Sequence, residues 1–377
     1  MTHLYSVLSQ LENELGHVYE YSLCVERAAS MNGWTHIGWV PRNCPIPTIP
    51  AHWQKNLPKN WGRPIISWLW IFWGWLFCYW KAIRGVPPSS IFLLDNLNLP
   101  QTFTFSLALL LAGKSPQLWV IQRHSPHEMR RRGKWLSDLV KWISRCLGPN
   151  NFTLFTDSEL LVPKYTALFS KSIHLLPIPN TAIASAKRHL GIEGVIDCWW
   201  PGGSTRKEKG LAQIQRFSSL LKTKGSLPLR LIVAQKTQMQ GVIPSPSVLY
   251  IENNLNRSAY EAWLNSVHIA LLPYDPKNYS DKTSYIFAEA IAAGLMPLAR
   301  EGSWLAHELR RFSLEELLLD WDRTDLLEHI LYLHGDPKVR KKLQLMKEAY
   351  AKFHCMDQFA AALGLANDQF LQHPLRA

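Results

Sequence analysis

Residues 271–297 read LLPYDPKNYSDKTSYIFAEAIAAGLMP, and this stretch indicates the class of fold. It begins as an apolar run typical of the end of a buried strand, passes through a polar turn, and then becomes helical and rich in alanine. In an open α/β sheet, ligands bind beyond the carboxyl ends of the strands, where the N–H groups of a helix N-terminus favour an anion such as phosphate. We therefore expect an anion site here, with Lys282, Thr283 and Ser284 in the first helical turn and Glu289 further along the helix.

The same alternation of strand and helix extends outward from this junction over most of the chain. In the second half, it predicts strands at 194–200, 229–234, 248–252, 267–272 and 296–299. In the first half, it predicts strands at 4–11, 35–40, 90–95, 117–121, 152–156 and 173–177. Helical patterns separate most of these strands. Two successive series of this kind predict an α/β fold with two Rossmann-like, doubly wound parallel sheets and a cleft between them.

The length of 377 residues exceeds one ordinary core and suits two domains. A composition of 47% hydrophobic and 19% charged residues excludes extensive disorder. Prolines and small polar residues interrupt the pattern near 177–187, so we expect a first domain over 1–182 and a second over 183–345. We expect the helical tail 346–377 to cross back to the first domain. Six prolines in 41–64 predict a long irregular connection.

The net charge of +12 suits an anionic partner, which could be nucleic acid, an acidic membrane surface or a phosphorylated ligand. The six cysteines lie far apart, without the paired spacing of zinc ligands or of a small disulfide scaffold, so we expect reduced thiols. No cluster of carboxylate, histidine or cysteine ligands is visible, and we expect no bound metal. The first residues lack the pattern of a secretory signal, which favours a cytoplasmic protein.

Residues 61–80, WGRPIISWLWIFWGWLFCYW, have an unusual composition rich in tryptophan and flanked by basic residues. Tryptophan and basic side chains favour the headgroup boundary of a membrane, so we expect an interfacial helix. Two alternatives stay open, a helix packed inside the first domain or at an oligomer contact, and a membrane span. Residues 126–147 predict a basic amphipathic helix with Trp135 and Trp142. This helix forms either a solvated charged face or a second contact with a membrane or an anionic ligand.

The segment FAEAIAAGLMPLA at 287–299 resembles a motif of the nucleotide-sugar glycosyltransferases of the GT-B fold, in particular their large retaining group (family 4-like, group 1). The resemblance implies that Glu289 hydrogen-bonds the ribose of the donor nucleotide. In that group a second acidic residue comes earlier, with seven residues between the two, and Asp281 occupies this catalytic position in place of the usual Glu. Tyr279, Lys282 and Ser284 match a subset of the family in which the last two face the donor diphosphate.

Two further segments resemble the same family. GGSTRKEKGL at 202–211 is similar to its glycine-containing loop, which implies that Arg206 and Lys209 bind the diphosphate. Cations are needed there because the leaving nucleoside diphosphate gains negative charge as its bond to the sugar breaks. The segment 14–34 resembles the family's opening turn and implies that Gly16 and His17 lie on the side of the reacting sugar or the acceptor. A histidine near the cleft often contacts the donor sugar in this family, and our candidate is His124 rather than His127.

The resemblance implies a glycosyltransferase, of the hexosyltransferase type and retaining, that moves a sugar from a nucleotide-sugar donor to a hydroxyl acceptor without a metal or other cofactor. Together with residues 61–80, it predicts peripheral attachment to the cytoplasmic face of a membrane and a lipid-linked or envelope glycan as acceptor. A first alternative is a non-catalytic GT-B-like binding or assembly protein in glycan synthesis, favoured by Asp281. A second is a nucleic-acid binder using the basic helix, for which no recognition motif is visible, so we expect no nucleic-acid partner.

Overall fold

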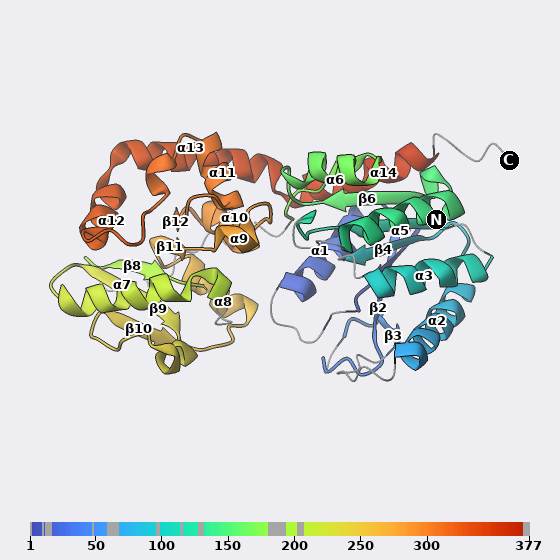
Figure 1. The fold of residues 1–377 in the computed structure, drawn as a ribbon, viewed down its shortest axis with the longest axis horizontal. Helices are drawn as coiled ribbons and strands as arrows, with labels where there is room; N and C mark the ends of the chain where they lie inside the picture. Colours follow the sequence, from blue (N-terminus) through green and yellow to red (C-terminus); the bar gives the residue numbers. More distant parts are fainter. Residues whose placement is uncertain are drawn as a thin grey trace. The chain divides into compact units, whose positions relative to one another are not determined.

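The computed structural model describes residues 2–9, 11, 17–46, 49–58, 68–95, 99–113, 116–126, 132–179, 194–201 and 207–371. The chain divides into two compact units (Figure 1). The first unit comprises Met1–Pro179 together with Met356–Ala377, and the second comprises Asn180–Cys355. Each unit has its own parallel sheet, so the chain is an α/β protein with two Rossmann-like domains.

Over its described residues, the first unit contains a seven-stranded parallel sheet in the order β3-β2-β1-β4-β5-β6-β7. The chain winds outward from β1 to β3 and then, from β4 onward, in the opposite direction. The strands are β1 (His3–Val7), β2 (Thr35–Pro41), β3 (Gln54–Leu57), β4 (Ile91–Asp95), β5 (Gln117–Ile121), β6 (Phe152–Thr156) and β7 (Ile173–Leu175). The helices are α1 (His17–Met31), α2 (Trp68–Arg84), α3 (Leu99–Leu111), α5 (Arg132–Leu147), η2 (Pro149–Asn151), α6 (Leu161–Phe169) and α14 (Met356–Leu371).

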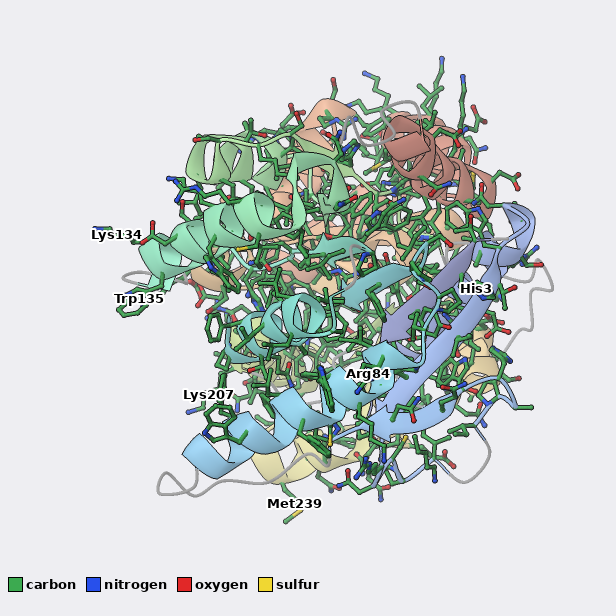
Figure 2. All side chains as sticks on the ribbon, turned by 90° about the vertical axis from the view of Figure 1, so that its right-hand side faces the viewer. His3, Arg84, Lys134, Trp135, Lys207 and Met239 are labelled. Carbon is green, nitrogen blue, oxygen red and sulfur yellow. The ribbon has the colours of Figure 1, made fainter. Side chains whose placement is uncertain are left out.

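Helices cover both faces of this sheet, which explains why its central strands are apolar at almost every position. Helices α2, α3, α5 and α6 lie on one face (Figure 2). They pack on alternate strand residues such as Tyr5, Phe92 and Val120 to form the main core. On the other face, Trp34 packs edge-on against Trp119 of β5, with ring centroids 5.9 Å apart. Helices α1 and α14 pack together beside this second face.

The C-terminal helix α14 belongs to the first unit. Phe359 packs edge-on against Tyr21 of α1 at 5.6 Å, and the Asn32 amide donates a 2.9 Å hydrogen bond to the carbonyl oxygen of Ala360. Gln117 at the start of β5 donates to the Asn367 side chain at 3.2 Å. The preceding helix α13 (Pro337–Phe353) belongs to the second unit, so the crossing occurs ten residues after position 346, where we expected the tail to begin.

Strand β3 corrects one sequence expectation. Its residues, QKNL, lie inside the proline-rich segment for which we predicted an irregular connection. The strand has no alternating apolar pattern because it is an edge strand with two exposed residues and only Leu57 fully buried. An alternating apolar pattern in the sequence reveals a strand only where one of its faces is buried. Too few residues of β3 are buried to produce that pattern.

Helix α2, from the tryptophan-rich segment, has one buried and one exposed face. Leu76, Tyr79 and Ile83 join the main core of the first unit, whereas Trp73 and Phe77 are each 60% exposed. Residues 61–67 and the side chains of 68–71 lie outside the described part of the structure. Among the described residues, no helix combines the length and the apolar character needed to cross a bilayer.

Over its described residues, the second unit contains a five-stranded parallel sheet in the order β10-β9-β8-β11-β12. Its strands are β8 (Ile196–Trp199), β9 (Leu229–Ala234), β10 (Val248–Ile251), β11 (Ile269–Leu272) and β12 (Met296–Ala299). Its helices are η3 (Lys207–Lys209), α7 (Leu211–Thr223), η4 (Gln235–Gln240), α8 (Arg257–Leu264), α9 (Pro276–Tyr279), α10 (Tyr285–Ala293), α11 (Trp304–Arg311), η5 (Glu315–Leu317), α12 (Leu326–Gly335) and α13.

Candidate functional site

The strand order of the second unit defines where a ligand should bind. The chain winds from β8 toward β10 on one side and continues through β11 and β12 on the other, so winding reverses between the neighbouring strands β8 and β11. A crevice forms beyond the carboxyl ends of the strands at such a reversal, because the two following connections leave in opposite directions. The segments after β8 and β11 are those in which the sequence predicted donor-binding residues.

The segment after β11 forms a strand-to-helix junction, as its sequence predicted. β11 is fully buried between β8 and β12, and α10 follows the short helix α9. Ser284 is the N-cap of α10, and its hydroxyl accepts a 3.2 Å hydrogen bond from the Phe287 N–H. Gly294 ends the helix in the left-handed conformation with φ 81°. The first helical residue is Tyr285, so Lys282 and Thr283 precede the helix instead of forming its first turn, which corrects that expectation.

The loop after β8 packs against this junction through its backbone. The Asp275 N–H donates a 2.8 Å hydrogen bond to the carbonyl oxygen of Glu208, and Trp200 donates from its ring to the carbonyl oxygen of Lys209 at 3.1 Å. Gly210 adopts φ 86°, and a Cβ atom there would lie 2.3 Å from the Pro273 carbonyl oxygen. Only glycine fits this close approach, which brings two segments more than sixty residues apart into contact.

Lys209 is the predicted diphosphate ligand whose position the structure describes in this loop. Its ammonium lies 5.6 Å from the centre of the Tyr274 ring, and Tyr274 in turn packs against Tyr279 with ring centroids 4.5 Å apart. Lys209 therefore stands beside the β11 junction. Arg206, the other predicted ligand in the loop, lies outside the described residues.

Glu289 is fully buried in α10, with 0% of its surface exposed. Its Oε1 accepts a 2.7 Å hydrogen bond from Arg257 Nη1, and its Oε2 accepts a 2.8 Å hydrogen bond from the Tyr260 hydroxyl. Burial raises the pKa of Glu289, while the charge and hydrogen bond of Arg257 act in the opposite direction. Sequence reasoning found Glu289 but missed Arg257 and Tyr260, which lie on α8 and share no motif with it.

Asp281 is buried in the segment between α9 and α10, and Lys282 next to it is half-buried. Both follow the turn in which Asp275 caps α9 by accepting from the Lys277 N–H at 3.0 Å. The two predicted acidic residues therefore differ in position, because Asp281 precedes α10 and Glu289 lies within it. Their roles toward a donor stay predictions.

In the first unit, His124 follows β5, and its carbonyl oxygen accepts a hydrogen bond from the Tyr165 hydroxyl. The neighbouring Arg123 forms ion pairs with Asp95 at the end of β4 and with Asp157 just after β6, the latter at 2.7 Å. The sequence did not reveal this network, since its members come from three strand ends. His17 is the first residue of α1, and its side chain lies outside the described part of the structure. Gly16 and His127 lie outside the described residues altogether.

The expectation that no ligand cluster exists needs correction. Glu26, His36 and His52 of the first unit bring a carboxylate oxygen and two imidazole nitrogens within 4.8 Å of one another. They come from a helix, a strand and a turn, so no spacing in the sequence announces them. Their chemistry suits a metal ion, and they lie on elements other than those of the β8–β11 edge.

No protein-family model matches the chain, and no curated protein sequence matches it. Solved structures do match. A trehalose-6-phosphate synthase, OtsA, superposes with a TM-score of 0.70 at 12% identity, covering 99% of this chain and 100% of that one. The N-terminal domain of the Candida albicans trehalose-6-phosphate phosphatase gives a TM-score of 0.67 at 13% identity, covering 99% and 97%. The glycosyltransferase of kitacinnamycin gives 0.56 at 13% identity, covering 97% and 98%. The chain therefore has the GT-B-like fold of two Rossmann domains.

Proposed function

We propose that the chain is a glycosyltransferase that moves a sugar from a nucleotide-sugar donor to a hydroxyl acceptor, with the donor bound by the second unit. The observation that carries the proposal is the contact between the 207–210 loop and the 273–275 turn at the β8–β11 reversal. This contact puts a lysine beside a strand-to-helix junction, the position where an α/β sheet binds phosphate. One similar structure, from E. coli, is described as bound with UDP-2-fluoro glucose, which supports a nucleoside-diphosphate sugar as donor.

In this proposal the diphosphate is held by Lys209 and Arg206 from the loop after β8 and by Lys282 and Ser284 from the junction. Cationic groups and N–H dipoles fixed in a dry site stabilise the charge that develops on the leaving diphosphate. Ser284 is also the N-cap of α10. Its hydrogen bond from the Phe287 N–H fixes the position of the hydroxyl relative to the first turn of the helix.

Glu289 contacts the ribose hydroxyls, and Asp281 acts nearer the reacting sugar. Arg257 and Tyr260 each donate a hydrogen bond to the Glu289 carboxylate. These two donors fix the direction of the Glu289 carboxylate, which is what selective recognition of a diol requires. On the first unit, Gly16, His17 and His124 act on the side of the sugar or acceptor. A similar structure is described in terms of glycosyl transfer with retention, which supports a retaining reaction.

We further propose that the acceptor is a lipid-linked or envelope glycan and that the first unit docks on the cytoplasmic face of an anionic membrane. Aromatic contacts connect α2, α3 and α5, with Phe72 stacked on Phe103 at 6.1 Å and Phe103 packed on Trp142 at 5.5 Å. Exposed aromatic side chains beside exposed cations suit the headgroup region. The exposed members of this surface include Trp73, Phe77, Lys81, Arg84, Lys134, Trp135, Lys141 and Arg145. Figure 2 labels three of them, Arg84, Lys134 and Trp135.

A non-catalytic donor-binding or assembly protein is the second candidate. It is favoured by the complete burial of Glu289 beside Arg257 and by Asp281 at a position where the family usually has Glu. The two candidates differ in turnover, not in donor binding.

The test is an assay of nucleoside diphosphate release from UDP- and GDP-sugars, with and without lipid-linked acceptors. A glycosyltransferase releases UDP or GDP from one donor, and faster when its acceptor is present. Binding without release from any donor would select the second candidate, and neither binding nor release would contradict both.

A further inference from the structure

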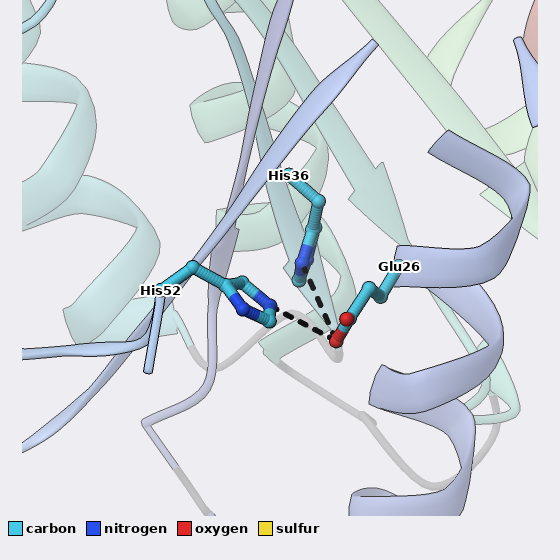
Figure 3. A group of neighbouring side chains, drawn as sticks. All are labelled: Glu26, His36 and His52. Carbon is cyan, nitrogen blue, oxygen red and sulfur yellow. Dashed lines mark ion pairs between the residues drawn. The ribbon is translucent and has the colours of Figure 1, made fainter. Parts of the chain in front are cut away.

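Three side chains of the first unit converge on one point behind the outer part of its sheet. Glu26 lies on α1, His36 on β2, and His52 in the turn before β3 (Figure 3). Glu26 Oε2 lies 3.1 Å from His52 Nε2 and 4.0 Å from His36 Nδ1. The two imidazole rings approach edge to face, with centroids 5.9 Å apart. In Figure 3, the dashed lines from the two imidazole rings end at the same oxygen of Glu26, which is Oε2.

A glycine in β2 allows the turn that contains His52 to pack against the strand. Residues 36 and 38 of a strand lie on the same face, and Gly38 has no side chain there. The Trp53 ring fills that space so closely that a Cβ atom on Gly38 would lie 2.7 Å from the ring. Tyr19 of α1 packs edge-on against Trp53 at 5.8 Å, so the helix, the strand and the turn meet at this tryptophan.

Two polar atoms of the cluster have no hydrogen bond among the described residues, and their nearest charged or polar neighbours are other members of the cluster. His36 is 7% exposed, and its Nε2 lies 2.9 Å from the Ser6 hydroxyl. Its Nδ1 and the Glu26 Oε2 are both buried without a hydrogen-bond partner among the described residues. Buried polar atoms are almost always bonded, so two unsatisfied ones facing each other call for a bound water or ion between them. An imidazole lone pair and a carboxylate oxygen are both electron-pair donors, which points to a cation.

We propose that Glu26, His36 and His52 form a binding site for a divalent transition-metal ion of the zinc class, through Oε2, Nδ1 and Nε2 respectively. Bonds of about 2.0–2.1 Å in a tetrahedron put neighbouring ligand atoms about 3.4 Å apart, and small side-chain rotations bring the three atoms to that spacing. Imidazole ligands favour zinc, cobalt, nickel or copper over calcium and magnesium.

Ser6 completes the arrangement as a positioning residue. When the Nε2–H of His36 donates to the Ser6 hydroxyl, the Nδ1 lone pair is directed at Glu26. A metal-bound histidine usually donates its second N–H to such a partner, which fixes the tautomer and the ring orientation. His36 is the second residue of β2, near the amino-terminal edge of the sheet, whereas ligands of α/β sheets bind at the carboxyl edge. The metal therefore acts as a structural clamp joining α1, β2 and the turn before β3, and the proposal is independent of sugar transfer.

The first experiment titrates the full chain, purified with chelator and then freed of it, with Zn²⁺ by calorimetry and with Co²⁺ by absorption spectroscopy. We expect one equivalent of metal, and a Co²⁺ spectrum with the intense visible bands of a four-coordinate site in which a water molecule joins the three side chains. Saturating Zn²⁺ should also raise the melting temperature. Failure to bind one equivalent of either ion would overturn the proposal.

The second experiment assigns the site to these residues. His52→Ala and Glu26→Gln change partly exposed side chains and should keep the circular dichroism spectrum, yet each should weaken Zn²⁺ binding at least tenfold and abolish the thermal shift. Ser6→Ala should weaken binding by about 10- to 100-fold, as changes to such supporting groups do. Glu20→Gln, on the same helix, is the matched control and should leave affinity unchanged. Wild-type affinity in both His52→Ala and Glu26→Gln would show that the metal binds elsewhere and overturn the assignment.

Discussion

The carboxyl edges of the two sheets carry different arrangements of charge. In the first unit, Arg123 forms ion pairs with both Asp95 and Asp157, so its positive charge is compensated within the protein. In the second unit, the ammonium of Lys209 lies 5.6 Å from the centre of the neutral Tyr274 ring, which belongs to the turn between β11 and α9. The same parallel-sheet geometry therefore carries an ion network at one edge, whereas the other edge carries the diphosphate site that we propose.

The largest expected effect concerns the buried pair of the second unit. Glu289→Ala leaves Arg257 partly buried and without its main partner, so we expect a loss of about 3–5 kcal/mol of unfolding free energy. Glu261→Ala removes a partly exposed partner of the same arginine and should cost about 1 kcal/mol or less. Urea unfolding followed by circular dichroism measures both. Equal losses in the two variants would show that the Glu289–Arg257 pair stabilises this unit no more than the Glu261–Arg257 pair does.

The network of the first unit gives the next largest effect. Arg123→Leu removes the guanidinium that pairs with Asp95 and with the buried Asp157, and we expect a loss of about 2–3 kcal/mol of unfolding free energy, because a broken pair leaves an uncompensated charge. Binding of UDP or GDP should stay within twofold of wild type, because the diphosphate site that we propose belongs to the other unit. A folded Arg123→Leu protein with diphosphate affinity reduced tenfold would break the contrast between the two edges.

The approach of the loop to the junction is tested at Gly210. Gly210→Ala adds a Cβ atom against the Pro273 carbonyl oxygen at a positive φ, so the loop must move and diphosphate affinity should fall at least tenfold. Gly241→Ala is the matched control, since its φ is +81° but its nearest neighbour is the flexible Gln215 side chain at 3.1 Å. Calorimetric titration with UDP and GDP compares the two variants. Equal affinities would show that the close packing of Gly210 against Pro273 is not needed for diphosphate binding.

A smaller effect is expected for membrane attachment through the first unit. Trp73→Ser combined with Phe77→Ser replaces two exposed rings and should reduce co-sedimentation with anionic vesicles severalfold without loss of melting temperature. Leu345→Ser, an equally accessible apolar position in the second unit, serves as control and should change nothing. Unchanged sedimentation of the double variant would exclude α2 as the docking surface.

Local features of the fold could be predicted from sequence. The apolar run before Pro273, the alanine-rich helix and the stop at Gly294 are encoded in neighbouring residues, and the structure has β11, α10 and a left-handed cap there. Strand β3 was missed because an edge strand with polar residues has no periodic signal. The exact start of α10 was misplaced by a few residues because Ser284 acts as its cap.

The partners within the sites could not be predicted, because they are set by contacts distant in sequence. Arg257 and Tyr260 meet Glu289 only when α8 packs beside α10. Lys209 meets Tyr274 only because β8 and β11 are neighbours in the sheet. Glu26, His36 and His52 converge through the space left by Gly38, which the sequence presents as an ordinary strand glycine. Motifs identified single residues, and the topology supplied their surroundings.

The central claim is that the β8–β11 edge binds a nucleoside diphosphate, and calorimetric titration of UDP and GDP into two lysine variants tests it most directly. Lys209→Ala removes the ammonium beside the junction, whereas Lys207→Ala removes an exposed lysine of the same short helix. The account predicts about tenfold weaker binding for Lys209→Ala, equivalent to about 1.4 kcal/mol, and wild-type binding for Lys207→Ala. Equal affinity of Lys209→Ala and wild type, or no binding of either nucleotide by the wild-type chain, would contradict it.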